Sequence, residues 1–300
     1  MSTEQACTSF RAGFIAVIGR PNVGKSTLVN ALVGERLAPT SPVPQTTRRR
    51  LLGILTTDET QLVFVDTPGL HEPVHPLGRW MVEDAEQALV DADVVLAVVD
   101  GTRVPGPEDD LVLGRARAVS APRFVVLNKS DAVAREDHRA EFRALAGPDT
   151  VHETSALRGD GLPALLAAVS AALPEHPAYF PADQVSDAME RDIAADLVRQ
   201  AAMRRLAEEL PHAVAVKVNT WTERENGVLY IQADLYVERD SQKGIVIGRG
   251  GRMLKSIGTL ARESLTHWLD QPIYLDLEVK VLKAWRKDER ALRYLGFTRA

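Results

Sequence analysis

Apolar and polar positions follow two different periodicities along the first half of the chain. Continuous apolar runs at 94–99 and 124–127 are typical of strands that are buried on both faces. Helical patterns separate such runs, as at 25–33 after the β-branched run 14–18. Further elements are predicted as strands at 51–57, 61–66 and 151–154, and as a helix at 162–173. This alternation of strand and helix predicts an α/β fold with a doubly wound, mostly parallel sheet.

The pattern changes after residue 173. Pro174, Pro177 and Pro181 lie close together, which disfavours a helix or a central strand. We therefore predict a first domain at 1–174, a linker at 175–187 and a second, smaller α+β domain at 188–300. The elements expected in the second domain are a helix at 189–210, strands at 213–220 and 228–238, a glycine-rich helical region at 244–269, a strand at 273–282 and a short terminal helix.

The segment between the first strand and the first helix has the pattern of a phosphate-binding loop. Residues 19–26 read Gly-Arg-Pro-Asn-Val-Gly-Lys-Ser, which fits G-x-x-x-x-G-K-[ST]. Glycines let backbone N–H groups point at phosphate oxygens, and the helix N-terminus adds the positive end of its dipole. Lys25 is expected to reach the β- and γ-phosphates, and the Ser26 hydroxyl to ligate Mg²⁺. A tight turn without a ligand is the weaker alternative, because the flanking elements match the motif.

A second motif, Asn128-Lys-Ser-Asp131, directly follows a predicted strand. Guanine presents two adjacent donors, and the carboxylate of Asp131 can accept both, whereas adenine would leave that carboxylate unpaired. Asn128 can hold the loop, and the stem of Lys129 can lie along the purine plane. A backbone N–H after the strand 151–154 can meet guanine O6. The predicted guanine-binding residues are Asn128, Lys129, Ser130, Asp131, Ser155 and Ala156.

Two further segments are expected to respond to the γ-phosphate of GTP. Asp66-Thr-Pro-Gly69 ends a strand, so Asp66 can hold a water ligand of Mg²⁺ and the Gly69 N–H can contact the γ-phosphate. Thr46 and Thr47 lie in a long polar loop, where one hydroxyl can complete the Mg²⁺ shell only with GTP bound. We prefer Thr47, with Thr46 nearly equal. The predicted phosphate contacts are Gly19, Arg20, Pro21, Asn22, Val23, Gly24, Lys25, Ser26, Thr27, Asp66, Thr67, Pro68, Gly69 and Leu70, and the predicted catalytic residues are Lys25, Thr47 and Gly69.

Composition adds two exclusions and one clue. Cys7 is the only cysteine of the 300 residues, so one chain can form neither a disulfide nor a cysteine-based metal site. The polar start predicts no secretory signal, and no apolar run approaches the roughly 20 residues of a membrane helix. The net charge is −5, yet residues 242–262 carry several lysines and arginines and no acid. Such a local basic cluster can bind a polyanion.

These motifs, in this order, resemble the translation-factor-related class of P-loop GTPases, and several details resemble the Era family in particular. The phosphate loop contains Arg-Pro-Asn-Val, and Pro44-Gln-Thr-Thr-Arg48 and Asp66-Thr-Pro-Gly-Leu-His71 follow it. In the second half, residues 243–251 read Lys-Gly-Ile-Val-Ile-Gly-Arg-Gly-Gly, and residues 285–296 read Trp-Arg-Lys-Asp-Glu-Arg-Ala-Leu-Arg-Tyr-Leu-Gly. The resemblance covers nearly the whole chain.

The resemblance implies a bacterial GTPase whose second domain is a KH domain of type II. It also implies GTP and GDP as ligands, Mg²⁺ as cofactor, binding to the 3′ end of small-subunit (16S) ribosomal RNA and assistance to assembly of the 30S subunit. We expect a monomer in the cytoplasm, and peripheral contact with the inner membrane stays open.

Hydrolysis is expected to be slow. Ras-like GTPases carry a glutamine after D-x-x-G that orients the attacking water, whereas this chain has Leu70, whose apolar side chain cannot do so. In relatives with this substitution, an asparagine of the phosphate loop helps to bind K⁺, which stabilises transition-state charge. Asn22 stands at that position. The resemblance thus implies a K⁺ site, and a loop asparagine that satisfies its own backbone is the alternative.

Residues 248–251, Gly-Arg-Gly-Gly, fit the G-x-x-G loop with which KH domains clamp a nucleic-acid backbone. Glycines allow close approach to phosphate, and Arg249 supplies charge. A glycine-rich turn between packed helices is the alternative, and the acid-free basic cluster favours RNA. For the basic residues of 283–293, an exposed helix face and an RNA contact stay equally open. The predicted RNA-binding residues are Lys243, Gly248, Arg249, Gly250, Gly251, Arg252 and Lys255.

The favoured hypothesis is a GTPase in which GTP prepares the second domain for RNA and hydrolysis releases it. A constitutive RNA-binding protein with a structural nucleotide site is the rival from another class, and the presence of Lys25, Thr47 and Asp66 disfavours it. A GTPase that serves membranes or tRNA modification is a third hypothesis, which the loop 248–251 disfavours.

Overall fold

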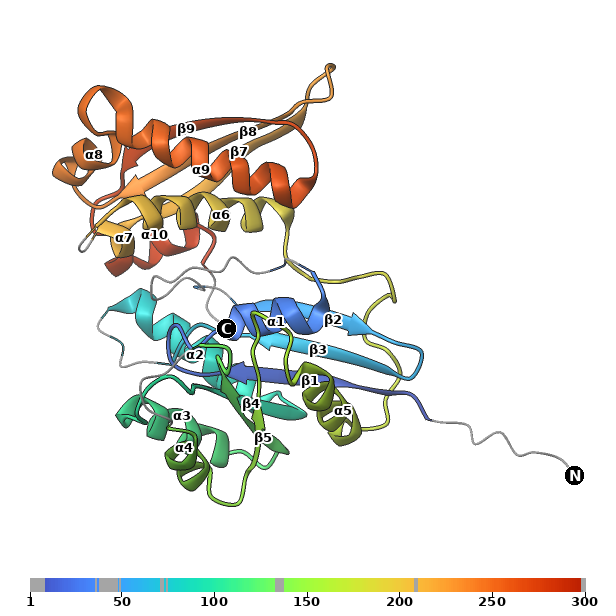
Figure 1. The fold of residues 1–300 in the computed structure, drawn as a ribbon. Coiled ribbons are helices and arrows are strands. Elements are labelled where there is room, and N and C mark those ends of the chain that lie inside the picture. Colours follow the sequence, from blue (N-terminus) through green and yellow to red (C-terminus); the bar gives the residue numbers. More distant parts are fainter. Residues whose placement is uncertain are drawn as a thin grey trace, which may run out of the picture. The chain divides into compact units, whose positions relative to one another are not determined.

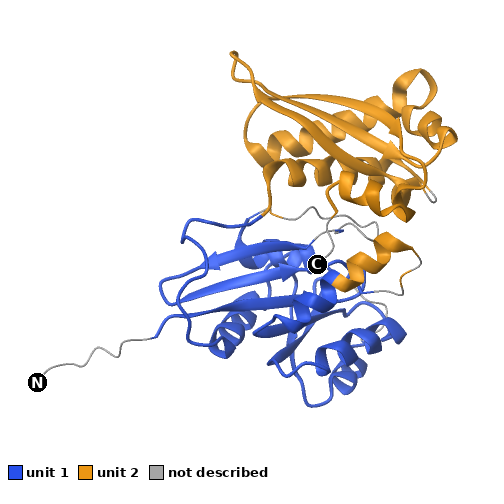
Figure 2. Ribbon diagram, turned by 180° about the vertical axis from the view of Figure 1, so that it is seen from behind, with its two compact units in different colours: residues 1–35, 47–71, 84–187 blue, residues 36–46, 72–83, 188–300 orange. Residues whose placement is uncertain are grey.

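The computed structural model describes residues 9–35, 37, 48, 50–70, 73, 75–132, 138–207 and 210–297. The chain divides into two compact units, with the main boundary between Asp187 and Ala188 (Figures 1 and 2). The first unit is built on a six-stranded sheet and the second on a separate three-stranded sheet. Each unit is described by itself. No helix among the described residues is long and apolar enough to cross a membrane.

The sheet of the first unit is mostly parallel, with the strand order β2-β3-β1-β4-β5-β6. Only β2 runs antiparallel, and it lies at the edge beside β3. Its strands are β1 (Arg11–Ile18), β2 (Leu51–Thr56), β3 (Thr60–Asp66), β4 (Val94–Asp100), β5 (Arg123–Asn128) and β6 (Thr150–Glu153). The helices along this part of the chain are α1 (Lys25–Val33), α2 (Pro76–Val90), α3 (Pro107–Arg117), α4 (Arg139–Ala146) and α5 (Leu162–Ala172). The part of α2 up to Glu83 is grouped with the second unit. The predicted α/β fold class is confirmed.

The parallel strands bring their carboxyl ends to one edge of the sheet. β4 is buried along its whole length, as its continuous apolar run predicts. In register, Val17 of β1 lies beside Asp66, and Asp100 lies beside Asn128 at the end of β5. Polar groups that are far apart in sequence are therefore collected where open α/β sheets bind their ligands.

The segment 175–187 does more than connect the two units. It lies against the edge strand β2, where Ile54 N donates to Val185 O over 2.9 Å and Ser186 Oγ donates to Leu52 O over 2.7 Å. Leu52 N donates in turn to Asp187 Oδ1 over 2.9 Å. An edge strand exposes unpaired backbone groups, and this segment covers some of them.

The second unit packs helices on one face of a three-stranded sheet with the order β7-β8-β9 (Figures 1 and 2). β7 and β8 are antiparallel, whereas β8 and β9 are parallel. Its elements are α6 (Glu190–Arg205), α7 (Leu210–Ala213), β7 (Ala215–Glu223), β8 (Leu229–Val237), α8 (Asp240–Ile247), the 3₁₀ turn η1 (Arg249–Gly251), α9 (Arg252–Leu269), β9 (Ile273–Val281), the 3₁₀ turn η2 (Trp285–Lys287) and α10 (Glu289–Tyr294). This is a smaller α+β unit with the predicted order of main elements.

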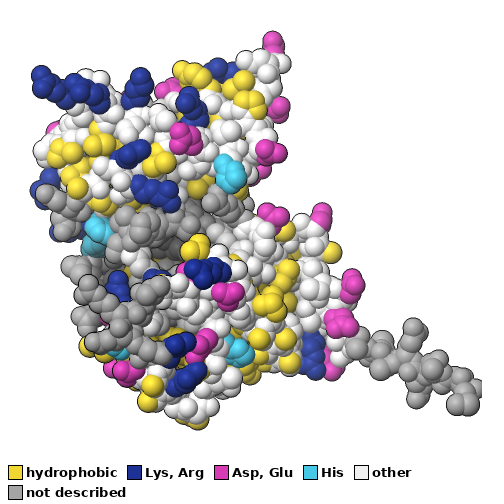
Figure 3. Space-filling model, viewed as in Figure 1, with side chains coloured by type: hydrophobic (Ala, Val, Ile, Leu, Met, Phe, Trp, Pro, Cys, Tyr) yellow, Lys and Arg dark blue, Asp and Glu magenta, His cyan; other side chains and the backbone are white. Residues whose placement is uncertain are grey.

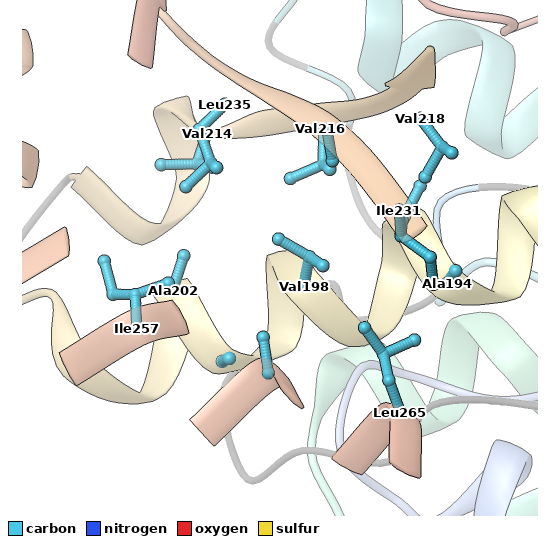
Figure 4. Close-up of a cluster of buried hydrophobic side chains, with 14 of the residues drawn as sticks. Ala194, Val198, Ala202, Val214, Val216, Val218, Ile231, Leu235, Ile257 and Leu265 are labelled. Atoms are coloured by element: carbon cyan, nitrogen blue, oxygen red, sulfur yellow. The ribbon is translucent and has the colours of Figure 1, made fainter. Parts of the chain in front are cut away.

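The core of the second unit lies between these helices and the sheet. Figure 4 shows Val198 of α6 facing Val216 of β7, with Ile257 and Leu265 of α9 in the same cluster. The helix predicted at 189–210 is shorter in the structure, because the backbone becomes extended at Leu206 (φ −92°, ψ 154°), whose side chain is buried in this core. Burial of a leucine in the core outweighs continuation of the helix there.

Candidate nucleotide site and nucleic-acid interface

The predicted phosphate loop connects β1 to the first turn of α1. Gly24 has φ 98°, in the left-handed region that favours glycine. A Cβ at Gly24 would lie 2.4 Å from the side-chain nitrogen of Asn128. This position therefore needs glycine for its backbone and for the close approach of the asparagine. Asn22, in the same loop, also has a positive φ, of 66°.

Lys25 is buried within the loop, with 6% of the residue exposed. Its Nζ donates to the carbonyl oxygens of Gly19 and Arg20, each over 3.1 Å. Burial lowers the pKa of Lys25 to about 8, and the negative charge of Asp66 offsets only part of this effect. An anionic group in the loop would favour the charged ammonium. The arrangement thus suits a phosphate.

Two of the three predicted protein groups of the Mg²⁺ site lie together. The Ser26 hydroxyl, on α1, donates to Oδ2 of Asp66 over 2.6 Å. Asp66 ends β3 and is fully buried. A hydroxyl and a carboxylate are hard oxygen donors of the kind Mg²⁺ accepts, often with waters and phosphate oxygens in the remaining positions. The donor set therefore fits this ion.

The segment after Asp66 approaches the phosphate loop closely. Leu70 N donates to Gly19 O over 3.1 Å, and a Cβ at Gly69 would lie 2.8 Å from Pro21. Leu70 is buried, with 2% exposed. The hydroxyl of Thr67 donates to Val17 O over 2.8 Å and thereby anchors the segment to β1. Thr46, Thr47 and His71 lie outside the residues that the structure describes.

Asn128 connects three segments of the site. Its Nδ2 donates to Val23 O in the phosphate loop over 2.9 Å. Its Oδ1 accepts from Ala156 N over 3.0 Å and from the Thr154 hydroxyl over 3.3 Å. The predicted role of Asn128 in holding the loops together is thus visible in its contacts. All of these groups are buried.

The rest of the guanine-reading motif lies beside Asn128. The Ser155 hydroxyl donates to Oδ1 of Asp131 over 2.6 Å, and Ser130 N donates to Thr154 O over 3.0 Å. These bonds join the loop after β5 to the loop after β6. The Ser155 hydroxyl thus fixes one carboxylate oxygen of Asp131, and this hydrogen bond does not involve the other oxygen. The structure brings together the guanine-binding residues that the sequence predicts.

Two buried acids at this edge of the sheet were missed by the sequence motifs. Asp100, which ends β4, lies 2.8 Å from the Lys129 ammonium. Asp109, at the start of α3, lies 3.1 Å from the Arg20 guanidinium, and burial raises its pKa even though Arg20 opposes the shift. The only signal in the sequence was an acid directly after the apolar run 94–99, which is a weak one.

In the second unit, the predicted G-x-x-G loop joins α8 to α9. Gly248, Gly250 and Gly251 have φ values of 72°, 62° and 74°, so three of its four residues are in the left-handed region. A Cβ at Gly248 would lie 2.7 Å from the side chain of Met253, whereas a Cβ at Gly250 or Gly251 would meet nothing within 4 Å. The tip of the loop is therefore open, and its base is closely packed.

Basic side chains surround this loop. Arg249, Arg252 and Lys255 are exposed and Lys243 is half-buried. Figure 3 shows lysine and arginine side chains gathered at the end of the second unit that carries α8 and this loop. Val246 of the same segment is fully buried, whereas Ile245 is exposed beside the basic side chains. Charge thus faces solvent around an open stretch of backbone, as binding to a phosphate backbone requires.

The basic residues near the end of the chain are in part engaged with neighbours. Arg286 forms an ion pair of 2.5 Å with Glu238, which is largely buried, and Arg293 lies 3.3 Å from Glu289. The Arg286 contact holds the pKa of Glu238 below its ordinary value against the effect of burial. For Arg286, the structure favours an internal ion pair over a contact with RNA.

The fold and the site define a class. A doubly wound sheet with a phosphate loop, a Ser–Asp pair and an N-K-x-D loop is typical of a P-loop GTPase, here followed by a KH domain. Family models agree: residues 14–129 match the model described as 50S ribosome-binding GTPase, and residues 209–286 match that of the KH domain.

Relatives extend this agreement over the whole chain. GTPase Era of Deinococcus deserti is 45% identical over 303 aligned positions, which cover 99% of this chain and 98% of that protein. A crystal structure of an Aquifex aeolicus Era variant bound to GDP.AlF4− has a TM-score of 0.91 at 36% identity, covering 96% of this chain and 100% of that one. Another, of Era in complex with MgGDPNP and nucleotides 1506–1542 of 16S ribosomal RNA, has a TM-score of 0.90 at 36% identity, covering 96% and 99%. This chain belongs to the Era family of GTPases.

Proposed function

We propose that this protein is a GTP-hydrolysing switch that binds the 3′ end of 16S ribosomal RNA through its KH domain and assists assembly of the 30S subunit. One observation carries the proposal: the Era structure that covers 96% of this chain contains both MgGDPNP and that RNA segment. Both sites have counterparts here in the phosphate loop and in the loop 248–251.

In the nucleotide site, each residue has a role that follows from its position. Lys25 binds the β- and γ-phosphates, and the N–H groups of the phosphate loop and of Gly69 complete the phosphate cradle. Ser26 and Asp66 hold Mg²⁺, Ser26 as a direct ligand and Asp66 through a water, and Thr47 is our proposed additional ligand when GTP is bound. When present, Mg²⁺ neutralises charge that develops on the phosphates.

Guanine is selected by hydrogen bonding. Asp131 accepts from N1–H and from the 2-amino group. The Ala156 N–H, which the sequence suggested for O6, instead donates to Asn128 Oδ1 and holds the loop. The proposal is supported by the Ser155 hydroxyl, which holds Oδ1 of Asp131, and by Asn128, which ties this loop to the phosphate loop. A base without the two donors would leave a carboxylate unpaired.

For hydrolysis, we propose a slow intrinsic rate and stimulation by K⁺. Leu70 is buried and apolar, so it offers no group that could orient water. Asn22 is our proposed K⁺ ligand. It belongs to the phosphate loop, and its main chain is held in a left-handed conformation.

For RNA, we propose that Gly248, Gly250 and Gly251 admit the backbone and that exposed cations around them neutralise its phosphates. Lys243, Arg249, Arg252 and Lys255 are these cations. Each phosphate contact should steepen the salt dependence of binding. The open tip at Gly250 supports close approach of a polymer.

We also propose the domain division 1–174, 175–187 and 188–300, a monomer, and a cytoplasmic location. The boundary between the two compact units, between Asp187 and Ala188, supports the proposed end of the linker at residue 187. Peripheral contact with the inner membrane is a further proposal, which a vesicle-binding assay would test. A constitutive RNA-binding protein with a structural nucleotide site is the alternative, and the Ser26–Asp66 pair, together with Lys25, argues against it.

The direct test is binding of the purified full-length protein to a fluorescent oligonucleotide that matches the 3′ end of 16S ribosomal RNA. Binding is measured with GDP and with a non-hydrolysable GTP analogue, over a range of salt concentrations. Tighter binding with the analogue, weakened by salt, is expected. Equal binding in the two states would support the constitutive alternative, and no binding would remove the ribosomal role.

A further inference from the structure

Asp100 is a buried acid that no motif explains. It ends β4 and is 2% exposed. A buried carboxylate is costly unless its oxygens are paired, and both oxygens of Asp100 are. Oδ2 accepts from the Lys129 ammonium over 2.8 Å, and Oδ1 accepts from the Thr102 hydroxyl over 2.6 Å and from Thr102 N over 3.1 Å.

These contacts favour the charged form of the acid. Burial alone would raise the pKa of Asp100, but the hydrogen bonds from Lys129 and Thr102 outweigh it and hold that pKa below its ordinary value. Arg103 is mostly exposed, and its Nε lies 3.8 Å from Oδ2, so it adds little. The main partner of the buried charge is the Lys129 ammonium.

Lys129 also reaches the phosphate loop. Its Nζ donates to Asn22 O over 2.7 Å, across a separation of 107 residues. Lys129 and Asn22 both have left-handed backbones, with φ of 67° and 66°. Residues other than glycine keep such conformations only where their surroundings impose them. The Asp100–Lys129–Asn22 series is one such set of contacts.

The neighbouring residue makes a parallel connection. Asn128 donates to Val23 O, so consecutive residues of the guanine-reading loop hold consecutive carbonyls of the phosphate loop. The bond from Asn128 is neutral, whereas the one from Lys129 depends on where its ammonium is held. Asp100 contacts that ammonium over 2.8 Å from the end of β4, the strand between β1 and β5.

We propose that Asp100 is a positioning residue: its carboxylate fixes the Lys129 ammonium, which holds the guanine-reading loop against the phosphate loop and so lengthens the lifetime of the bound nucleotide. Asp100 acts through Lys129. The proposal rests on the nucleotide site proposed above, and it assigns that site a residue outside its sequence motifs.

The test is Asp100→Asn in the full-length protein, read as the dissociation rate of a fluorescent GDP analogue. The amide keeps the size of the side chain and an acceptor for Thr102, but it removes the charge that holds Lys129. Dissociation should accelerate by about tenfold, the expected effect of losing a charge-assisted hydrogen bond. The ratio of GDP to IDP affinity should not change, because Asp131 reads the 2-amino group. A general loss of structure would disturb both quantities.

A matched control and a double variant isolate the mechanism. Asp93, just before the start of the same strand, accepts from Phe14 N over 2.8 Å, and Asp93→Asn should leave dissociation unchanged. Lys129→Met should accelerate dissociation, and adding Asp100→Asn to it should have no further effect, because the two residues act in series. Independent, multiplying effects would overturn the proposal, and so would an unchanged rate in Asp100→Asn.

If Asp100→Asn does not fold by circular dichroism, the comparison of Lys129→Arg with Lys129→Met decides instead. The proposal is supported if Lys129→Arg keeps the wild-type dissociation rate and Lys129→Met accelerates dissociation. Equal acceleration in both variants overturns it. Failure of the wild-type protein to bind GDP would refute the nucleotide site itself, and that result is distinct from wild-type binding that Asp100→Asn leaves unaltered.

Discussion

In the first unit, Lys25, Asp66 and Asn128 are buried and hydrogen-bonded to neighbouring segments of the site, whereas in the second unit the tip of the ligand loop is exposed and open. A Cβ at Gly24 would meet Asn128 at 2.4 Å, but a Cβ at Gly250 would meet nothing within 4 Å. A small ligand can be selected by a closed set of hydrogen bonds. A polymer must be approached from outside, so its loop needs access and charge. The difference predicts that a substitution of the base-reading carboxylate in the first site alters ligand identity, and that substitutions in the second site alter affinity alone.

The largest effect should come from Asp131→Asn. A carboxylate matches the two donors of guanine, whereas an amide offers one acceptor and one donor, which fits xanthine. The preference for GTP over xanthosine triphosphate should reverse, from a discrimination on the order of 10⁴ at a site built on such hydrogen bonds. Competition of both triphosphates against a fluorescent nucleotide measures it. Asp160→Asn, which removes a charge in the neighbouring loop, is the control, and retained GTP preference would refute the assignment.

The next effect should come from Gly250→Asp. Aspartate tolerates a left-handed backbone better than most residues, and the site has room for it, so the fold should persist. A carboxylate facing phosphate should weaken RNA binding by about tenfold or more and leave GTP turnover unchanged. Gly227→Asp is the matched control, because Gly227 has φ 73° and equally open surroundings in the β7–β8 turn. An equal loss of RNA affinity in both variants would show that RNA does not bind at the loop 248–251.

The buried lysine should make nucleotide affinity depend on pH. Since burial lowers the pKa of Lys25 to about 8 and phosphate favours its charged form, binding above this pH must include uptake of a proton. Affinity should be flat from pH 7 to 8 and then fall by up to about tenfold per pH unit. Titration with a fluorescent GDP analogue measures this. Lys25→Arg, which stays charged, should give a flat profile if it binds, and a flat profile in the wild-type protein would contradict the prediction.

The smallest effect concerns the cation at Asn22. Replacing Na⁺ by K⁺ should accelerate GTP hydrolysis several-fold, up to about tenfold, by stabilising transition-state charge. Asn22→Gly should remove the difference, because glycine keeps the left-handed backbone and lacks the amide. Phosphate release in the two salts at equal ionic strength is the measurement. Stimulation by K⁺ that survives in this variant would place the cation elsewhere.

Much of the fold could be predicted from local patterns. Continuous apolar runs indicated β4 and β5 because strands covered on both faces need apolar side chains at every position. Prolines predicted a linker after residue 174, but not that Val185 and Ser186 of this linker pair with β2, because that contact depends on the exposed edge of a distant strand. The prediction that the helix continues beyond Arg205 was wrong for a similar reason, since burial of Leu206 is a tertiary effect.

The candidate site divides in the same way. Sequence motifs predicted the phosphate loop and the guanine-reading loop, because binding of phosphate and of guanine needs particular residues at fixed spacing. They did not indicate Asp100, whose partner Lys129 lies one strand further along the sheet. The choice of Thr47 over Thr46 stays a prediction, since both lie outside the described residues.

By itself, the sequence determined the class of the protein and the chemistry of its two sites, because glycine, lysine, serine and aspartate at these spacings have few other uses. Only the tertiary structure decided that Asp100 supports Lys129, that Arg286 pairs with Glu238, and that Lys25 has a pKa near 8. The physical reason is that desolvation and Coulomb interaction depend on distance and burial. Neither quantity exists until strands far apart in the chain lie side by side.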